Sequence, residues 1–408
     1  MLSILINAYA CSPDMGSEPG MAWNWCVNLA NYCELHIITE GEFRDKIEAI
    51  VPTLPQGRNM HFYYNPVLEE VRRMCWNQGD WRFYKHYRVW QYRTYEIALD
   101  IMTAHHIDIV HQLNMIGFRE PGYLWKIKEV PLVWGAVDAK EKFPIAYLQG
   151  AGLKQQLFMR LKNFLTGLQL KHSLRVRNAA KYASVVVSAS SESQKSFKKY
   201  FDIDSPLLNE TGCYPQVYDL KNKLQKKEFD LLWVGKLDFR KQLVLAIRTV
   251  AQMNNSSVKL HIVGGGDASF YQQLAESLGI ASQCVWHGLV MHDEVQHLMR
   301  VADVFFFTSV AEGTPHVVLE AIGNNLPVVC FDVCGQGDSV NELVGCKITL
   351  STPAQSVKDF AKVLNGLEAN RGLLKQLSLN CHKRQEELSW DNKAKQMLEL
   401  YKSCSRTV

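Results

Sequence analysis

The sequence predicts an α/β protein of two domains, each built on a parallel β-sheet covered by helices. Short apolar segments alternate with segments of helical period along the whole chain, which is typical of βαβ units. The alternation restarts near residue 228, after a polar, Lys-rich stretch. A chain of 408 residues is also longer than a domain with a single hydrophobic core usually is, so two domains are expected.

The first domain is expected at 1–210 and the second at 228–388, with a linker at 211–227. The apolar segments predict strands at 2–7, 34–39, 60–64, 107–112, 131–134 and 184–189, and then at 229–234, 258–263, 284–286, 303–308 and 327–331. Helical periodicity is clear at 19–32, 241–253, 268–278 and 316–324. Residues 389–408 are predicted to form a C-terminal helix that packs back on the first domain.

Composition narrows the class of protein. Hydrophobic residues make up 47% and charged residues 21%, as in ordinary globular proteins, and the net charge of +4 gives little support for nucleic-acid binding. The eleven cysteines form no CxxC pair, which favours reduced thiols over a zinc site or disulfides. The chain starts with a strand, without a signal peptide, and no window approaches the ~20 apolar residues of a membrane span. We therefore expect a cytoplasmic protein, with binding to the inner membrane surface left open.

Two glutamates eight positions apart follow the strand at 303–308. Glu312 precedes a turn and Glu320 lies in the helix after it, so Glu312 is suited to sugar hydroxyls and Glu320 to the paired hydroxyls of a ribose. A helix starts here, and its first N–H groups favour an anion. The residues expected to contact that ligand are Gly313, Thr314, Pro315, His316 and Val317. The alternative to a ligand site is an ordinary helix N-terminus, where acidic residues are favoured by the helix dipole alone.

Cations and glycines follow other strands. The chain leaves the strand at 229–234 through Gly235 and then carries Lys236, Arg240 and Lys241, a charge suited to a diphosphate. Gly265, after the strand at 258–263, and Gly16, after the first strand, allow a ligand to approach the backbone closely. The alternatives are a solvated loop for the cations and tight turns for the glycines.

Two segments of the first domain combine apolar and basic residues without many acids. One, within 71–95, is rich in aromatic and basic side chains, and we expect it to contact the acceptor or an anionic membrane through Trp81, Arg82, Tyr84, Arg88 and Trp90. The other, 143–191, has no Asp or Glu, and it contains a helical apolar stripe of Leu153, Leu157, Leu161, Phe164, Leu165 and Leu168. The alternative is that both are helices facing the core with a solvated basic side.

In their order and spacing, these motifs resemble the retaining glycosyltransferases of family 4, the glycosyl transferases group 1. That family has the GT-B fold, in which two Rossmann-like domains face each other across a deep cleft. The resemblance implies that Glu312 contacts the transferred sugar, Glu320 the ribose, and Lys236 and Lys241 the diphosphate. Lys236 stands where the family commonly has Arg. A lysine at this position keeps the charge but loses the bidentate fork of the guanidinium group, and Arg240 is the candidate to supply it instead.

The family also has a histidine near the end of a first-domain strand, close to the reacting centre. His111 is the candidate here, so the resemblance makes Glu312, His111 and Lys241 the catalytic candidates. Leu113 stands where the family's second histidine is frequent, so the role could instead fall to Asn114, Arg119 or Glu120. A histidine inside an apolar strand is otherwise commonly a core residue.

The function expected from the resemblance is transfer of a hexose-type sugar from a UDP- or GDP-sugar to a glycan or lipid-linked glycan, in lipopolysaccharide, capsule or related cell-surface polysaccharide synthesis. No cofactor or metal and no nucleic acid is expected. The alternatives are a sugar-nucleotide epimerase of the same fold and a non-catalytic sugar-binding protein. The base, the sugar and the acceptor are not readable from these residues.

Overall fold

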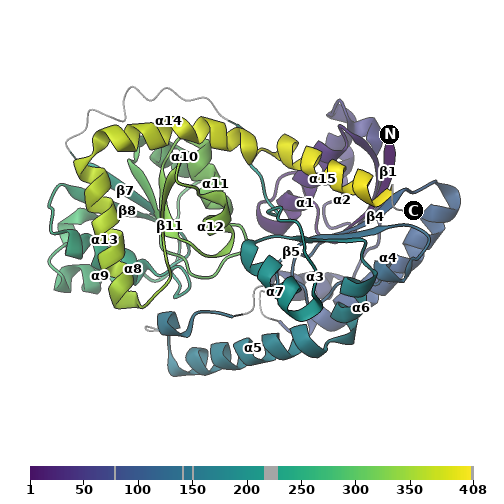
Figure 1. Cartoon of the computed structure of the whole chain (residues 1–408), viewed down its shortest axis with the longest axis horizontal. Coiled ribbons are helices and arrows are strands. Elements are labelled where there is room, and N and C mark those ends of the chain that lie inside the picture. Colours follow the sequence, from purple (N-terminus) through teal and green to yellow (C-terminus); the bar gives the residue numbers. More distant parts are fainter. Residues whose placement is uncertain (78–79, 140–141, 149–150, 216–227, 406–408) are drawn as a thin grey trace. The chain divides into compact units, whose positions relative to one another are not determined.

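The computed structural model describes residues 1–77, 80–139, 142–148, 151–215 and 228–405 (Figure 1). The chain divides into two compact units, each with its own parallel sheet of six strands and flanking helices. The predicted fold class of two Rossmann-like domains is therefore confirmed. Unit 1 comprises Met1–Glu141, Leu165–Thr211 and Trp390–Val408, and unit 2 comprises Lys142–Phe164 and Gly212–Ser389.

The units differ from the expected ranges because segments cross between them. Residues 142–164, predicted in the first domain, group with unit 2. The Tyr147 hydroxyl bonds with Ser356 Oγ at 2.7 Å, and the Tyr147 ring packs edge-on against Phe331. Asn163 exchanges two side-chain hydrogen bonds with the backbone of Phe143. Most of the predicted linker, 216–227, lies outside the described residues.

The sheet of unit 1 has the order β3-β2-β1-β4-β5-β6, with every pair parallel. Its strands are β1 (Leu2–Ala8), β2 (Cys33–Thr39), β3 (Met60–Tyr64), β4 (Ile109–Asn114), β5 (Leu132–Val137) and β6 (Val185–Ser188). Strands β4 and β5 are buried along their whole length, as expected of a parallel sheet covered on both faces. The chain order reverses between β1 and β4, and open α/β sheets bind ligands at such a point.

The sheet of unit 2 has the same arrangement, in the order β12-β11-β10-β7-β8-β9, and reverses between β7 and β10. Its strands are β7 (Phe229–Val234), β8 (Val258–Val263), β9 (Cys284–Gly288), β10 (Val304–Phe307), β11 (Val328–Phe331) and β12 (Gly345–Ile348). Strand β12 was not predicted, because its four residues include the exposed Lys347 and form no apolar run.

Helices connect the strands in both units. Unit 1 contains α1 (Ser17–Leu29), α2 (Arg44–Ile50), α3 (Glu69–Trp76), α4 (Phe83–Ala104), α6 (Leu174–Tyr182), α7 (Ser191–Phe201) and α15 (Trp390–Ser405). Unit 2 contains α8 (Leu243–Met253), α9 (Ser269–Ser277), α10 (His292–Val301), α11 (His316–Gly323), α12 (Cys334–Ser339), α13 (Pro353–Ala369) and α14 (Arg371–Glu387). The division between the units falls inside α5 (Leu153–His172).

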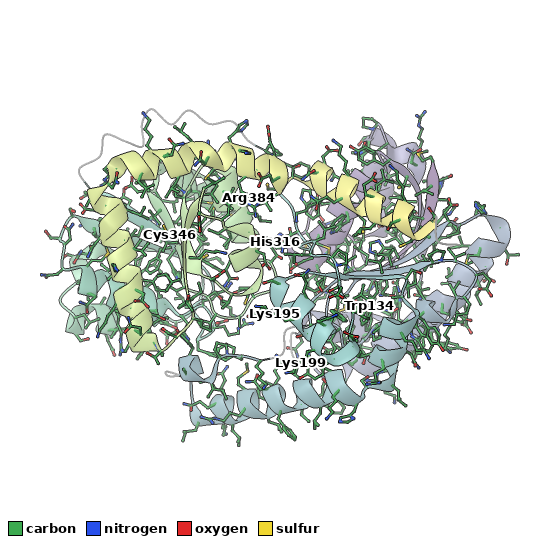
Figure 2. The ribbon with its side chains drawn as sticks, viewed as in Figure 1. Trp134, Lys195, Lys199, His316, Cys346 and Arg384 are labelled. Carbon is green, nitrogen blue, oxygen red and sulfur yellow. The ribbon has the colours of Figure 1, made fainter. Side chains whose placement is uncertain are left out.

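Burial of one face holds each helix in place. On α7, Phe197 is buried and packs edge-on against Trp134 of β5 at 5.7 Å, whereas Lys195 and Lys199 of the same helix are exposed (Figure 2). Helix α15 packs against α1, where the rings of Trp390 and Trp25 meet edge-on at 5.7 Å. Apolar burial of this kind is the main stabilising term for such elements.

Candidate functional site

The candidate site of unit 2 lies where the loops after β7 and β10 meet. These strands are direct neighbours in the sheet, and the strand order reverses between them. The loop after β7 carries Lys236, Arg240 and Lys241, and the loop after β10 carries Glu312. Parallel strands end at the same edge of a sheet, so residues far apart in sequence come together there.

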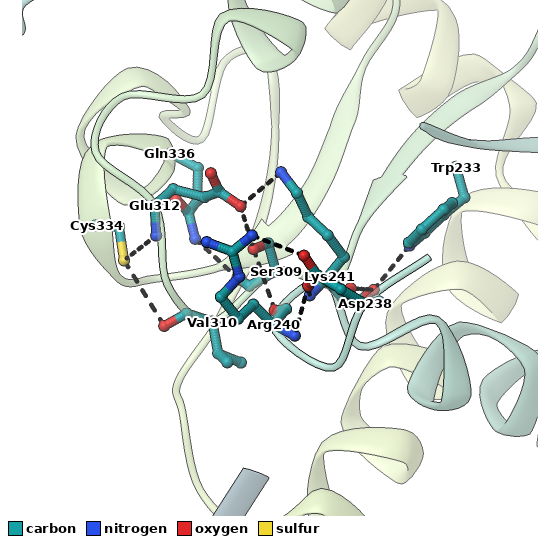
Figure 3. Close-up of polar contacts among 10 residues, drawn as sticks. Trp233, Asp238, Arg240, Lys241, Ser309, Val310, Glu312, Cys334 and Gln336 are labelled. Carbon is teal, nitrogen blue, oxygen red and sulfur yellow. Dashed lines mark hydrogen bonds and ion pairs between the residues drawn. The ribbon is translucent and has the colours of Figure 1, made fainter. Parts of the chain in front are cut away.

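Lys241 and Glu312 form an ion pair at this edge. Lys241 Nζ lies 2.6 Å from Glu312 Oε1, and Ser309 Oγ donates to the same oxygen at 2.6 Å (Figure 3). The two side chains are only 18% and 19% exposed, so the interaction is partly shielded from water. The structure thus brings together two of the three catalytic candidates.

A hydrogen-bond network that the motif analysis missed joins the two loops. Thr308 Oγ1 accepts from Trp233 Nε1 at 3.0 Å and donates to the Lys241 carbonyl at 2.8 Å. The Val310 N–H donates to the Arg240 carbonyl at 3.2 Å, and Gln336 Nε2 donates to the Ser309 carbonyl at 3.1 Å. The local signal of this network in the sequence was the pair of hydroxyl residues between the strand and Glu312, Thr308 and Ser309.

The other two cations of the β7 loop behave differently from each other. Arg240 is held by Asp238, with Arg240 Nη2 2.7 Å from Asp238 Oδ2, and this bond raises the pKa of Arg240 (Figure 3). Lys236 is exposed; its carbonyl accepts from Asp238 N at 2.7 Å, but no hydrogen bond or ion pair joins its side chain to the residues of the described ranges. Arg240 therefore has a carboxylate partner of its own, whereas the Lys236 side chain is exposed to solvent.

The glycines after β7 and β8 pack against each other. Gly264 has a φ of +147°, and a Cβ there would lie 1.9 Å from the Gly235 carbonyl oxygen. Gly265 instead has room, since a Cβ there would meet only Leu289 at 3.9 Å, and its carbonyl accepts from Leu237 N at 3.0 Å. Close packing of the two loops thus explains why a glycine stands at position 264. This agrees with the alternative of a tight turn that the sequence analysis left open for these glycines.

The turn between Glu312 and Glu320 leads into α11. Pro315 is the N-cap of this helix, and Thr314 is buried. The Gly313 carbonyl accepts from Gly335 N at 2.9 Å, which ties the turn to the start of α12. At the first residues of the helix, Val317 is partly buried, and burial lowers the pKa of His316. One turn later, Glu320 Oε2 accepts from Gln296 Nε2 at 3.2 Å.

His111, the candidate in unit 1, lies in the core. It is fully buried in β4, its Nδ1 is 2.6 Å from the Tyr401 hydroxyl, and its Nε2 contacts the Gly135 carbonyl. Burial lowers the pKa of His111 to about 4, so the ring is neutral at pH 7. The structure corrects the placement of His111 at a reacting centre: no atom of its side chain reaches the surface, because α15 covers it with Tyr401.

The remaining candidates of unit 1 differ in exposure. Gly16 is the exposed N-cap of α1. Asn114, one of the residues considered in place of His111, is buried and donates to the Ala10 carbonyl. Arg119 and Glu120 lie in the loop after β4, and the carboxylate of Glu120 pairs with Arg88 and Arg175.

The aromatic and basic segment 71–95 divides into surface and core residues. Trp81 is 78% exposed, Tyr84 and Arg88 are also exposed, and the exposed Arg82 pairs with Asp80 at 2.6 Å. Trp90 is buried, and its Nε1 donates to the Asn65 carbonyl at 2.6 Å. Trp90 is thus a core residue, which corrects its expected contact with an acceptor or membrane.

The apolar stripe predicted within 143–191 lies on α5 and faces solvent. Seven large apolar side chains of this helix are 41–84% exposed: Leu153, Leu157, Phe158, Leu161, Phe164, Leu165 and Leu168. A different face of α5 is buried through Met159, Asn163, Thr166 and Leu170. The alternative of a core-facing stripe is therefore wrong.

Two features are absent from the described residues: a membrane-spanning helix and a cluster of metal ligands. None of their helices is long and apolar enough to cross a membrane. No group of three or more His, Cys, Asp or Glu side chains among them is arranged to hold a metal ion.

Solved structures of glycosyltransferases have the same fold as this chain. HepE of Anabaena in complex with UDP has a TM-score of 0.59 at 14% identity, covering 99% of this chain and 100% of that one. WaaG, a glycosyltransferase of lipopolysaccharide biosynthesis, has a TM-score of 0.57 at 17% identity, covering 98% and 99%. The lipopolysaccharide outer core galactosyltransferase WaaB has a TM-score of 0.64 at 16% identity, covering 96% and 98%. The two Rossmann-like units thus form the GT-B fold.

The family-model match lies in the second half of the chain. Residues 217–384 match the family model described as Glycosyl transferases group 1. An uncharacterized glycosyltransferase of Methanocaldococcus jannaschii is 31% identical over 182 residues, 44% of this chain and 46% of that protein. The lipopolysaccharide glucosyltransferase WaaG of Escherichia coli is 29% identical over 141 residues, 34% of this chain and 37% of that protein. The matches span less than half the length of these curated relatives, and the stretch matched by the family model includes the Lys241–Glu312 site.

Proposed function

We propose that this protein is a retaining glycosyltransferase that moves a hexose-type sugar from a nucleoside-diphosphate sugar to a glycan or lipid-linked glycan of the cell surface. The observation that carries the proposal is the Lys241–Glu312 pair at the strand-order reversal of unit 2, inside the segment that matches glycosyl transferases group 1. UDP and UDP-glucose complexes of HepE, which has the same fold, support a uridine nucleotide donor.

In the proposed reaction, the bond between the sugar C1 and the diphosphate oxygen breaks while C1 bonds to the acceptor hydroxyl on the same face. The acceptor proton passes to the departing diphosphate oxygen. Lys241 and Lys236 neutralise the negative charge that develops on the diphosphate, and Glu312 orients the sugar hydroxyls. Glu320 receives the ribose hydroxyls. Because two lysines supply the positive charge, we expect the reaction to proceed in the presence of a chelator.

The test is nucleotide release from UDP- and GDP-sugars, with thermal shift over the free nucleoside diphosphates to identify the base. We expect one base to raise the Tm of wild type, slow release of that diphosphate, and loss of release in Glu312→Ala. As a matched control, Glu294→Ala removes an exposed acid at the start of α10 and should leave release unchanged. Equal release by wild type and Glu312→Ala would refute the assignment of the site.

The exposed face of α5 supports an anionic lipid surface as a further partner. At about 100° per residue, the seven exposed apolar side chains occupy one arc of the helix, which also carries Lys154 and Lys171, and Arg160 and Lys162 lie at its two borders. The helix contains no Asp or Glu. Apolar side chains flanked by cations are typical of helices that lie in a membrane interface, and we propose that α5 holds the protein on such a surface.

Vesicle flotation tests this part of the proposal. A Leu157→Gln/Leu161→Gln/Phe164→Gln variant should bind vesicles of phosphatidylglycerol at least about 100-fold more weakly than wild type, from the loss of three partly inserted side chains. Leu373→Gln/Leu379→Gln, on exposed apolar positions of α14, is the matched control and should bind as wild type does. Equal flotation of all chains, or a dimer through α5 without vesicle binding, would overturn the proposal.

A further inference from the structure

A pocket in unit 1 gathers three arginines around one carboxylate. It has a volume of about 370 Å³, and its walls include Trp81, Tyr84, Arg88, Arg119, Glu120 and Arg175. These residues come from the start of α4, the loop after β4 and the start of α6. The loop after β4 lies at the strand-order reversal of the first sheet, where α/β sheets bind ligands.

Glu120 is the centre of the pocket and is saturated by two of the arginines. Its side chain is 6% exposed, and Oε1 lies 2.7 Å from Arg88 Nη2 while Oε2 contacts Arg175 Nη1. The same two bonds align the guanidinium groups, because a carboxylate accepts from each arginine in a fixed direction. The carboxylate therefore positions the cations and cancels one of their charges.

Two groups of the pocket retain binding capacity. The Nε and Nη2 atoms of Arg175 are buried without a hydrogen-bond partner among the described residues. Arg119 donates to Gln169 Oε1 at 2.8 Å and to Thr166 Oγ1 at 2.6 Å, and both of these acceptors are neutral. Buried N–H groups of charged side chains are costly to leave unpaired, so the free donors of Arg175 favour an acceptor from outside the chain.

Charge and size define the ligand. Three guanidinium groups against one carboxylate leave an excess of about two positive charges, which matches a phosphomonoester of roughly −1.5 to −2 at pH 7. The volume exceeds that of a phosphate and leaves room for part of the group that carries it. The exposed ring of Trp81 forms an apolar wall for such a group.

We propose that this arginine pocket binds a phosphate monoester group. The role of the pocket rests on the proposed function: the pocket would hold the acceptor by its phosphate while unit 2 binds the donor. The phosphate belongs either to a sugar of the acceptor or to a lipid headgroup at the surface that α5 faces.

Calorimetry with glucose 1-phosphate, a soluble phosphomonoester, tests the site in the intact chain. Wild type should bind it, and Arg119→Gln and Arg175→Gln should each bind it about 10- to 100-fold more weakly, the loss typical of a charged hydrogen-bond donor. Lys195→Gln removes an exposed cation of α7 and should bind as wild type does (Figure 2). Should Arg175→Gln fail to fold because Glu120 loses a partner, Arg119→Gln carries the test, since its partners are neutral.

Flotation with phosphatidic acid vesicles, against phosphatidylcholine vesicles, separates the two sources of phosphate. Arginine-dependent binding of glucose 1-phosphate supports a phosphate of the acceptor. Arginine-dependent binding of phosphatidic acid vesicles without binding of the soluble ester supports a lipid headgroup. If neither ligand depends on Arg119 or Arg175, the proposal is overturned. Neither assay requires sugar transfer, so failure here would leave the donor site of unit 2 untouched, and failure of UDP binding would leave this result readable.

Discussion

Removing the two charges of the Lys241–Glu312 pair should have opposite effects on the binding of a nucleoside diphosphate. In the ligand-free protein Lys241 is neutralised by Glu312 at 2.6 Å. Glu312→Gln frees the ammonium group and removes a negative charge that repels the diphosphate. Lys241→Gln removes the cation itself and leaves that repulsion unopposed.

The magnitudes follow from Coulomb interactions in a partly shielded site. A carboxylate roughly 6 Å from one phosphate charge, at an effective dielectric constant of about 40, repels it by about 1.4 kcal/mol, so Glu312→Gln should bind the diphosphate about tenfold more tightly. Loss of a charged donor in Lys241→Gln should weaken binding about 10- to 100-fold. Glu312→Gln should at the same time lower sugar transfer at least about 100-fold, because the sugar is no longer oriented.

The assay is calorimetry with the nucleoside diphosphate selected by thermal shift, on wild type, both single variants and the double variant. Double-variant binding should depart from the sum of the two single effects, because the groups are in contact. The reasoning is refuted if both single variants bind within twofold of wild type, or if Glu312→Gln binds more weakly than wild type.

Three further predictions concern single residues. His111→Leu should lower the free energy of unfolding by about 2–4 kcal/mol in urea titrations, because Tyr401 and the Gly135 carbonyl lose a buried partner, while kcat of the folded variant changes less than about threefold; a hundredfold loss of kcat would restore a catalytic role. Burial raises the pKa of Glu18 to about 7, above its ordinary value, so the folded state binds more protons and wild type loses stability as pH rises from about 4.5 to 7. Glu18→Gln should remove that loss, with a gain over wild type of at most about 3 kcal/mol at pH 8 that disappears at pH 4; a difference that does not vary with pH would contradict this. Gly335→Ala should weaken diphosphate binding at least about tenfold, because its Cβ would lie 2.6 Å from Thr314 Cα, whereas Gly366→Ala in α13, where nothing lies within 4 Å, should bind normally and be equally or more stable; equal binding by both would show that the turn tolerates the methyl group.

Much of the fold and of the unit 2 site followed from local patterns. Of the twelve strands in the described residues, eleven were predicted because a buried parallel strand is apolar along its length, and β12 was missed because it contains an exposed lysine. Lys241 and Glu312 were each predicted as donor-binding residues because each follows a strand; the structure pairs them, since parallel strands end at one edge of a sheet. Residue order and strand position were enough for these inferences.

Other features depended on contacts between segments distant in sequence. His111 is a core residue because α15 brings Tyr401, 290 positions away, onto it. Trp81 and Trp90 belong to one aromatic segment, yet only Trp81 is at the surface. The arginine pocket required three separate segments to converge on Glu120, and no local pattern records that convergence.

The apolar stripe of α5 shows where the two kinds of information separate. The sequence by itself determined that one face of this helix is an apolar stripe and that the segment has no acids, because side-chain period and composition are local. Only the tertiary structure decided that this face meets solvent while Met159 and Leu170 turn inward, because burial depends on which surfaces the rest of the chain supplies. The same division holds for the Lys241–Glu312 site of unit 2. The sequence showed which residue types follow each strand, whereas tertiary packing determined which of them form hydrogen bonds and ion pairs with one another.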